Sequence, residues 1–146
     1  MKKIFILILL LNSTYSFACS CMYSEFGIKD YNNAAYIVKG EVIKVRIDEK
    51  NYKRIITFKV TDSYKVKVGK VIEIETALNS AACGVNINYQ DKWLLFVNEY
   101  NGQKSISLCD KNVRYNRRPN QDKKSSKESC QKMKTYIRKI KSFKNG

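Results

Sequence analysis

The chain is predicted to fold mainly as β-structure, as a small closed barrel or a sandwich. Between residues 36 and 109, five or six short segments rich in Val, Ile, Tyr and Phe follow one another with turn signals between them. The length of 146 residues is sufficient for a single domain. Periodicity alone does not distinguish a barrel from a sandwich.

The first 18 residues are predicted to be a signal peptide and not part of this fold. Two lysines precede an apolar run at residues 4–11, and residues 16–18 (Ser-Phe-Ala) form a small-x-small cleavage site. The run is shorter than the roughly 20 residues that cross a bilayer. A lipoprotein is the alternative because Cys19 follows the site directly, although residues 16 and 17 depart from the usual lipobox. We therefore expect a secreted protein, extracellular or periplasmic.

Alternating and β-branched segments predict the strands, after a short helical segment within residues 23–35 that is broken near Gly27. Residues 70–76 are typical, because Ile72 and Ile74 alternate with glutamates. Trp93 and Phe96 are expected in the barrel core. The expected strands span residues 36–46, 52–66, 70–76, 85–89, 92–100 and 103–109.

The composition changes after residue 110, so residues 19–110 are expected to form the barrel and 111–146 a basic C-terminal region. Residues 111–128 are polar and charged, which predicts a linker or a surface loop. In residues 126–144 apolar positions are spaced 3-4-3, which predicts an amphipathic helix packed on the barrel. Ser126 or Ser129 is expected to cap this helix.

Charge is concentrated in this C-terminal region. Without the two lysines of the leader, 26 Lys and Arg face 13 Asp and Glu, a net charge of +13. Residues 19–110 carry +2 of this charge and residues 111–146 carry +11. The basic region is either a solvated helix face or a surface that attracts anionic glycans or membranes. Nucleic acid is not an expected partner, because the aromatic residues of the basic region do not form the interleaved stacking platform that single-strand binders use.

The residue types present argue against an enzyme. The chain contains no histidine, which excludes His-based triads, His-ligated zinc and a His general base. The five cysteines, all after the cleavage site, lack the spacing of a zinc finger. We therefore expect no cofactor or metal of the protein's own. In an oxidising compartment these cysteines are expected to form disulfides.

Four segments together resemble the inhibitory domain of the tissue inhibitors of metalloproteinases, part of the wider netrin-like family. The first is Cys19-Ser20-Cys21, which would begin the mature chain after cleavage. A weaker match lies at residues 31–34, the strongest at 76–85 (TALNSAACGV), and another at 106–110 (ISLCD). The resemblance covers residues 19–110, and Cys130 continues it.

The resemblance implies a five-stranded closed barrel of the oligonucleotide/oligosaccharide-binding (OB) type with flanking helices. It also implies disulfides Cys19–Cys83 and Cys21–Cys109, whereas four cysteines alone allow three pairings. A third disulfide that is usual in the family is absent, because Asn32 stands where the partner of Cys130 is expected. Cys130 is then either an unpaired thiol under the helix or a route to a covalent dimer.

The function implied by the resemblance is inhibition of a zinc metalloprotease. The amine and carbonyl of Cys19 would bind the target's catalytic zinc at its open position, and Ser20 would enter the specificity pocket. Met22 and the loop at residues 79–82 would line the cleft on both sides. The expected inhibitory edge comprises Cys19, Ser20, Cys21, Met22, Asn79, Ser80, Ala81 and Ala82.

A second reading stays open beside the inhibitor. In it, the cysteines at positions 19 and 21 are purely structural, and the chain is a non-inhibitory netrin-like module that engages anionic glycans or surfaces through its basic helix.

Overall fold

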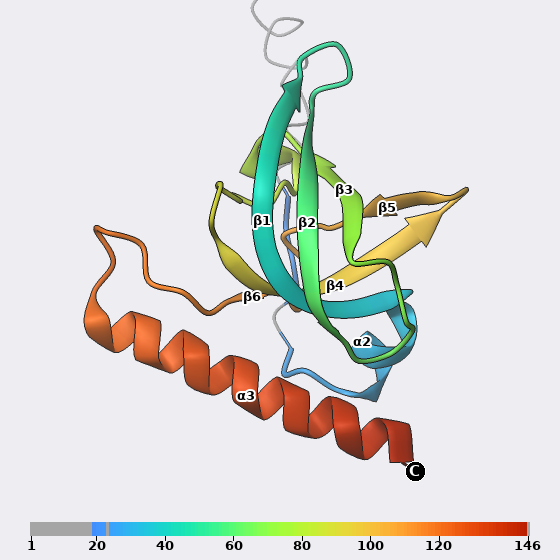
Figure 1. Cartoon of the computed structure of the whole chain (residues 1–146), viewed down its shortest axis with the longest axis vertical. Helices are drawn as coiled ribbons and strands as arrows, with labels where there is room; N and C mark the ends of the chain where they lie inside the picture. Colours follow the sequence, from blue (N-terminus) through green and yellow to red (C-terminus); the bar gives the residue numbers. More distant parts are fainter. Residues whose placement is uncertain (1–18, 23, 146) are drawn as a thin grey trace, which may run out of the picture.

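The protein is a closed five-stranded β-barrel with a long C-terminal helix across one end (Figure 1). The computed structural model describes residues 19–22 and 24–145, so the expected signal peptide lies outside the described residues. No helix within the described part of the chain is long and apolar enough to cross a membrane.

Strand order and direction give the barrel the topology of an OB fold. The order is β1-β2-β3-β5-β4, and β1 pairs with β4 to close the ring. All pairs are antiparallel except β3 with β5, which is parallel. The bounds are β1 Tyr36–Asp48, β2 Lys53–Ser63, β3 Val71–Ala77, β4 Lys92–Tyr100, β5 Gln103–Ser105 and β6 Val113–Arg114.

The barrel interior is filled by aliphatic and aromatic side chains from alternate strand positions. In β3, Ile72 and Ile74 point inward while the intervening glutamate at 73 is exposed, as the alternation predicted. Val38, Val42 and Phe58 are fully buried in the same interior cluster, together with Trp93. This core gives the barrel the fixed surface on which the edge loops rest.

A second apolar cluster lies outside the barrel, between β4, α2 (Ile28–Asn33) and α3 (Lys123–Asn145). Phe96 belongs to this cluster and not to the barrel interior where the sequence had placed it. The reason is that both faces of β4 are buried, so Leu94 and Phe96 meet the helices while Trp93 and Leu95 point inward. The ring of Phe26 packs on Phe96 at a centroid distance of 5.1 Å.

Helix α3 begins at Lys123, three residues before the predicted start, and its cap is Asp122 and not Ser126 or Ser129. The Asp122 carboxylate accepts hydrogen bonds from the backbone N–H groups of Lys124 (3.0 Å) and Ser125 (3.2 Å). The helix buries Met133, Tyr136 and Ile140, which confirms its predicted amphipathic contact with the barrel.

Two further differences from the expected elements concern loops. Residues 85–89 are not a strand: Val85 and Ile87 are buried in the core from a loop, in which the Ile87 N–H bonds the Val85 carbonyl. The predicted linker contains β6, which pairs with β4. The prediction of a strand at 85–89 was therefore wrong, although the apolar residues Val85 and Ile87 are buried.

Candidate functional site

The two disulfides fix residues 19–22 against the loops that follow β3 and β5. Cys19 bonds Cys83, 64 residues away, and Cys21 bonds Cys109, 88 residues away, as the resemblance implied. The two bridges lie side by side, because the Sγ atoms of Cys19 and Cys109 are 3.8 Å apart. In addition, the backbone nitrogen of Cys19 donates a hydrogen bond to the Ala81 carbonyl at 3.1 Å.

The loop beside Cys19 is a short 3₁₀ turn, Ser80–Ala82, closed at both ends by hydrogen bonds. The Asn79 side chain accepts from the Ala82 N–H at 2.9 Å. At the other end, Cys83 adopts a left-handed conformation (φ 62°), and its N–H donates to the Ser80 carbonyl at 3.1 Å. The turn is therefore held by local hydrogen bonds, one of them from the Asn79 side chain, as well as by the disulfide.

Gly84 and Thr76 attach this turn to the barrel. A Cβ on Gly84 would lie 2.1 Å from the Ala77 carbonyl oxygen, so no larger residue fits there. The buried hydroxyl of Thr76 accepts a hydrogen bond from the Val85 N–H at 3.0 Å. The sequence Cys-Gly thus places a half-cystine and a close backbone contact next to each other.

Asp110 organises the loop that carries the second bridge. Its carboxylate accepts from the Ser107 N–H (2.6 Å) and from the Asn98 side-chain amide (3.1 Å). Burial raises the pKa of this carboxyl above its usual value, while both hydrogen bonds act in the opposite direction. This loop is also joined to the 3₁₀ turn at Ser80–Ala82, because the Leu108 N–H donates to the Cys83 carbonyl at 2.7 Å.

The side chains between and beside the bridges face solvent. Ser20 is exposed and Met22 is 95% exposed, although the bridges hold the residues next to them. Asn79, Ser80, Ala81 and Ala82 are exposed as well. The structure therefore brings the eight predicted edge residues together, with the two cysteines bonded to the loops and the side chains of Ser20, Met22 and Ser80 in solvent.

Two residues near this surface were not predicted from the sequence. The Tyr52 carbonyl accepts from the Leu78 N–H at 2.9 Å, which places the β1–β2 turn beside the loop, and the Tyr52 side chain is 75% exposed. Arg54 lines a hollow next to Asn79 and Ser80. In the sequence, the polar residues 48–51 indicate only a turn. The contact of this turn with the loop at Leu78 depends on strand pairing.

The sulfur atoms at this surface do not act as metal ligands while the bridges are intact. The Sγ atoms of Cys19, Cys83 and Cys109 lie within 4.8 Å of one another. Metal binding requires thiolates, and all three sulfurs form disulfides. What the arrangement offers chemically is the backbone of Cys19, with one nitrogen and one carbonyl oxygen.

Comparison with protein-family models and with curated proteins finds no match for this chain.

Proposed function

We propose that this protein inhibits zinc metalloproteases, as its resemblance to the tissue inhibitors of metalloproteinases implies. In this proposal, export removes residues 1–18, and Cys19 becomes the first residue. Its amine nitrogen and carbonyl oxygen then displace water from the open position of the target's zinc and bind the metal together.

The observation that carries the proposal is the double attachment of Cys19. This residue is bonded through sulfur to Cys83 and through its nitrogen to the Ala81 carbonyl. A group that is already fixed loses little conformational entropy on binding, so more of the interaction energy appears as affinity. In the uncleaved chain this nitrogen belongs to a peptide bond; after cleavage it would be an amine, whose neutral form can donate to Ala81 and present its lone pair to the zinc.

The neighbouring exposed residues supply contacts with the protease in this proposal. Ser20 enters the specificity pocket and Met22 lies along the cleft on one side. The loop at residues 79–82 lies along the other side. Catalytic turnover is not expected, because the chain presents an amine where a substrate presents a scissile amide.

The test is a pair of proteins that differ by one residue at the amino terminus. One begins at Cys19, and the other carries an additional alanine before it. The added residue converts the amine to an amide, which does not ligate zinc well, so we expect loss of at least roughly a hundredfold in affinity across a panel of zinc proteases. Equal inhibition by the two proteins, or inhibition by neither, contradicts the proposal.

The pH dependence gives a second readout of the same contact. A free α-amine has a pKa of about 7.7–8.0, and only its neutral form ligates a metal. Protons therefore compete with zinc increasingly as the pH falls below this range, and inhibition is expected to weaken. The extended protein has no such amine, so it serves as the control for pH effects on the protease itself.

Selectivity is expected to depend on Ser20. Replacement Ser20→Gly removes the side chain that would enter the specificity pocket, and the side chain has no structural role because it is exposed. We expect the ranking of inhibited proteases to change while the thermal midpoint stays within about 2 °C. An unchanged ranking contradicts the placement of Ser20 in that pocket.

A further inference from the structure

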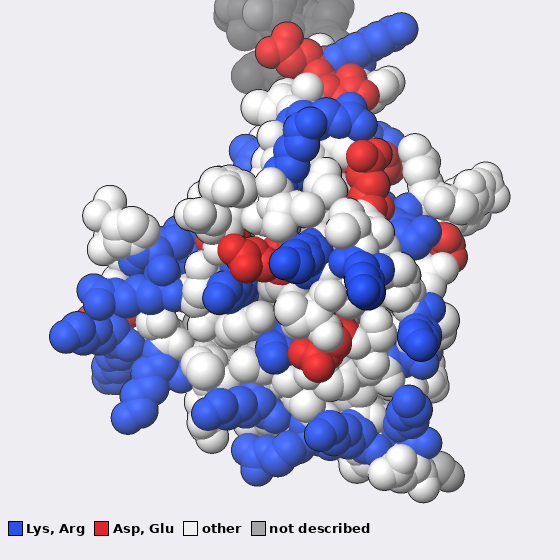
Figure 2. Space-filling model, in the orientation of Figure 1, with Lys and Arg blue, Asp and Glu red and all other residues white. Residues whose placement is uncertain are grey.

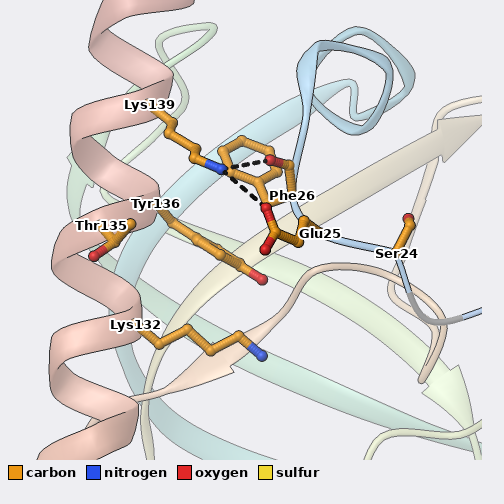
Figure 3. A pocket seen from close by; sticks show the side chains of 7 residues that line it. All are labelled: Ser24, Glu25, Phe26, Lys132, Thr135, Tyr136 and Lys139. Atoms are coloured by element: carbon orange, nitrogen blue, oxygen red, sulfur yellow. Dashed lines mark hydrogen bonds and ion pairs between the residues drawn. The ribbon is translucent and has the colours of Figure 1, made fainter.

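An open hollow of about 470 Å³ lies between α3 and the segment at residues 24–26, outside the barrel (Figure 3). Three side chains of α3 extend toward this segment from one side of the helix. The lining comprises Ser24, Glu25, Phe26, Lys132, Thr135, Tyr136 and Lys139.

Two ammonium groups line this hollow, one on either side of the Tyr136 ring (Figure 3). Lys139 donates to the Phe26 carbonyl at 3.2 Å and lies 3.9 Å from the Glu25 carboxylate. The Glu25 side chain is 97% exposed, so this ion pair is weak and easily displaced. Lys132 lies over the Tyr136 ring at 5.6 Å and forms no ion pair with any residue that the structure describes. The hollow therefore has an excess of positive charge.

One uncharged hydroxyl group also faces the hollow. The Tyr136 hydroxyl points into it (Figure 3), and burial raises the pKa of this phenol, with Asp30 and Glu25 adding to the effect. It therefore remains a protonated donor at neutral pH. Outside the hollow, Lys111 donates to the Ser24 carbonyl at 2.7 Å and to its hydroxyl at 3.3 Å and lies 4.0 Å from the Asp30 carboxylate, so its charge is already paired.

The helix around the hollow is strongly basic. Along its length α3 carries nine Lys and Arg residues and one acidic residue, Glu128. Figure 2 shows these side chains in a row along the edge of the molecule where α3 lies. Such a row creates a positive potential that attracts polyanions and concentrates them at this surface.

We infer that this hollow binds one anionic sugar unit, carrying a sulfate or carboxylate group, of an anionic glycan that lies along α3. The ammonium groups of Lys132 and Lys139 offer charge-assisted hydrogen bonds to the acidic groups of the glycan. The Tyr136 hydroxyl, which points into the hollow, donates to a hydroxyl of the sugar.

A nucleic acid fits the hollow less well than a glycan. Bases bind single-strand sites by stacking on open aromatic faces. The Tyr136 ring is only 9% exposed, since it packs on Phe26 at 4.7 Å and on Phe96 at 6.2 Å. The hollow therefore offers hydroxyl and ammonium groups but no free ring face.

The experiment compares two double variants with the same loss of charge. Lys132→Gln/Lys139→Gln removes the ammonium groups of the hollow, and Lys134→Gln/Lys141→Gln removes two exposed lysines outside it. The two residues of each pair are seven positions apart and therefore lie on one side of the helix. The two pairs are offset from each other by two positions, which places them on different sides. The binding of a heparin-derived hexasaccharide is measured by calorimetry at about 0.15 M salt, where distant charges are screened.

We expect the hollow variant to bind roughly tenfold or more weakly than the unaltered protein, because charge-assisted hydrogen bonds are lost. The control variant should lose about twofold, through long-range charge alone. Tyr136→Phe should also weaken binding, by removing one donor while the ring stays in place. Circular dichroism spectra that match those of the unaltered protein verify that α3 is intact in each variant.

Several outcomes would overturn the inference. Equal losses in the two double variants would mean that net charge, and not the hollow, determines binding. Undetectable hexasaccharide binding would also overturn it, as would binding of anionic lipid vesicles alone or of inorganic sulfate with the same affinity as the sugar. None of these measurements involves a protease, so this inference and the proposed inhibition can fail separately.

Discussion

The two ends of the chain are attached to the barrel by different physical means. The amino-terminal edge is held by two disulfides and a few backbone hydrogen bonds, with its side chains in solvent. The carboxy-terminal helix is held by an apolar cluster, and its half-buried Cys130 is a free thiol. The edge buries little apolar area, since even Met22 is 95% exposed, and covalent bonds fix it; the helix buries a continuous apolar face and is held without such a bond.

Polar contacts strengthen the attachment of the helical side. Lys65 donates to the carbonyls of Tyr31 and Asn32 at 2.8 and 2.9 Å, and also to that of Ala34, at the end of α2. Lys65 therefore links the end of α2 to the segment that follows β2. Burial lowers the pKa of Lys65.

The connection between barrel and α3 contains a buried ion pair. The Asp91 side chain is 4% exposed and accepts two hydrogen bonds from the Arg118 guanidinium. Asp91 also bonds the Asn88 N–H at 2.9 Å. The segment that the sequence presented as a linker is thus anchored before the helix begins.

The largest expected effect comes from removing the bridge at the edge. In the double variant Cys19→Ser/Cys83→Ser, a loop of about 65 residues is opened, which costs roughly 4 kcal/mol of unfolding free energy. Urea unfolding followed by tryptophan fluorescence measures this loss. The proposed inhibition should disappear as well, whereas hexasaccharide binding should remain under conditions where the protein is folded.

Phe26→Ala tests the other side of the comparison. The ring is 2% exposed and contacts Phe96, Tyr136 and Phe143, so its removal is expected to cost about 3 to 4 kcal/mol. Hydrogen exchange should speed up in α3 more than in β2 and β3. Equal acceleration everywhere would show that the helix and the barrel unfold as one unit, and the distinction between the two attachments would fail.

Removal of the guanidinium at the buried ion pair should have a smaller effect. Arg118→Met leaves Asp91 with Arg114 as its remaining cation, at 3.8 Å. Because one partner of a largely buried pair is lost, we expect a cost of about 2 kcal/mol in thermal unfolding. A matched change at an exposed lysine, Lys44→Met, should stay within about 0.5 kcal/mol. Similar values for the two variants would mean that the pair does not anchor the connection.

Lys65→Met is expected to have the smallest effect of the series, about 1.5 kcal/mol, since three carbonyl groups lose a charged donor but water reaches part of the site. Chemical denaturation measures the stability, and exchange of the α2 amides locates the change. If stability is unaffected, the contacts of Lys65 do not hold α2 in place.

The sequence predicted the regular parts of this fold because burial alternates where only one strand face is covered. Residues 71–77 follow that rule. It failed for Phe96, because helices cover the outer face of β4, and alternation carries no information when both faces are buried. It also failed at residues 85–87, where a loop fills the core.

The candidate site was less accessible from the sequence than the fold. Cysteine positions alone allowed three pairings, and the pairing that the structure contains was implied only by the resemblance. The hydrogen bond from Leu78 to Tyr52 joins residues far apart in the chain. The hollow that Lys132 and Ser24 both line does so as well. Such contacts follow from strand register and helix placement, which no local pattern encodes.

The most direct test of the proposed zinc chelation is the structure of the protein, beginning at Cys19, in complex with a zinc protease from the inhibition panel. We predict the Cys19 nitrogen and carbonyl oxygen at about 2.0–2.2 Å from the catalytic zinc, with the bound water displaced. A zinc that keeps its water, or one bound by any other part of this chain, would contradict the proposal.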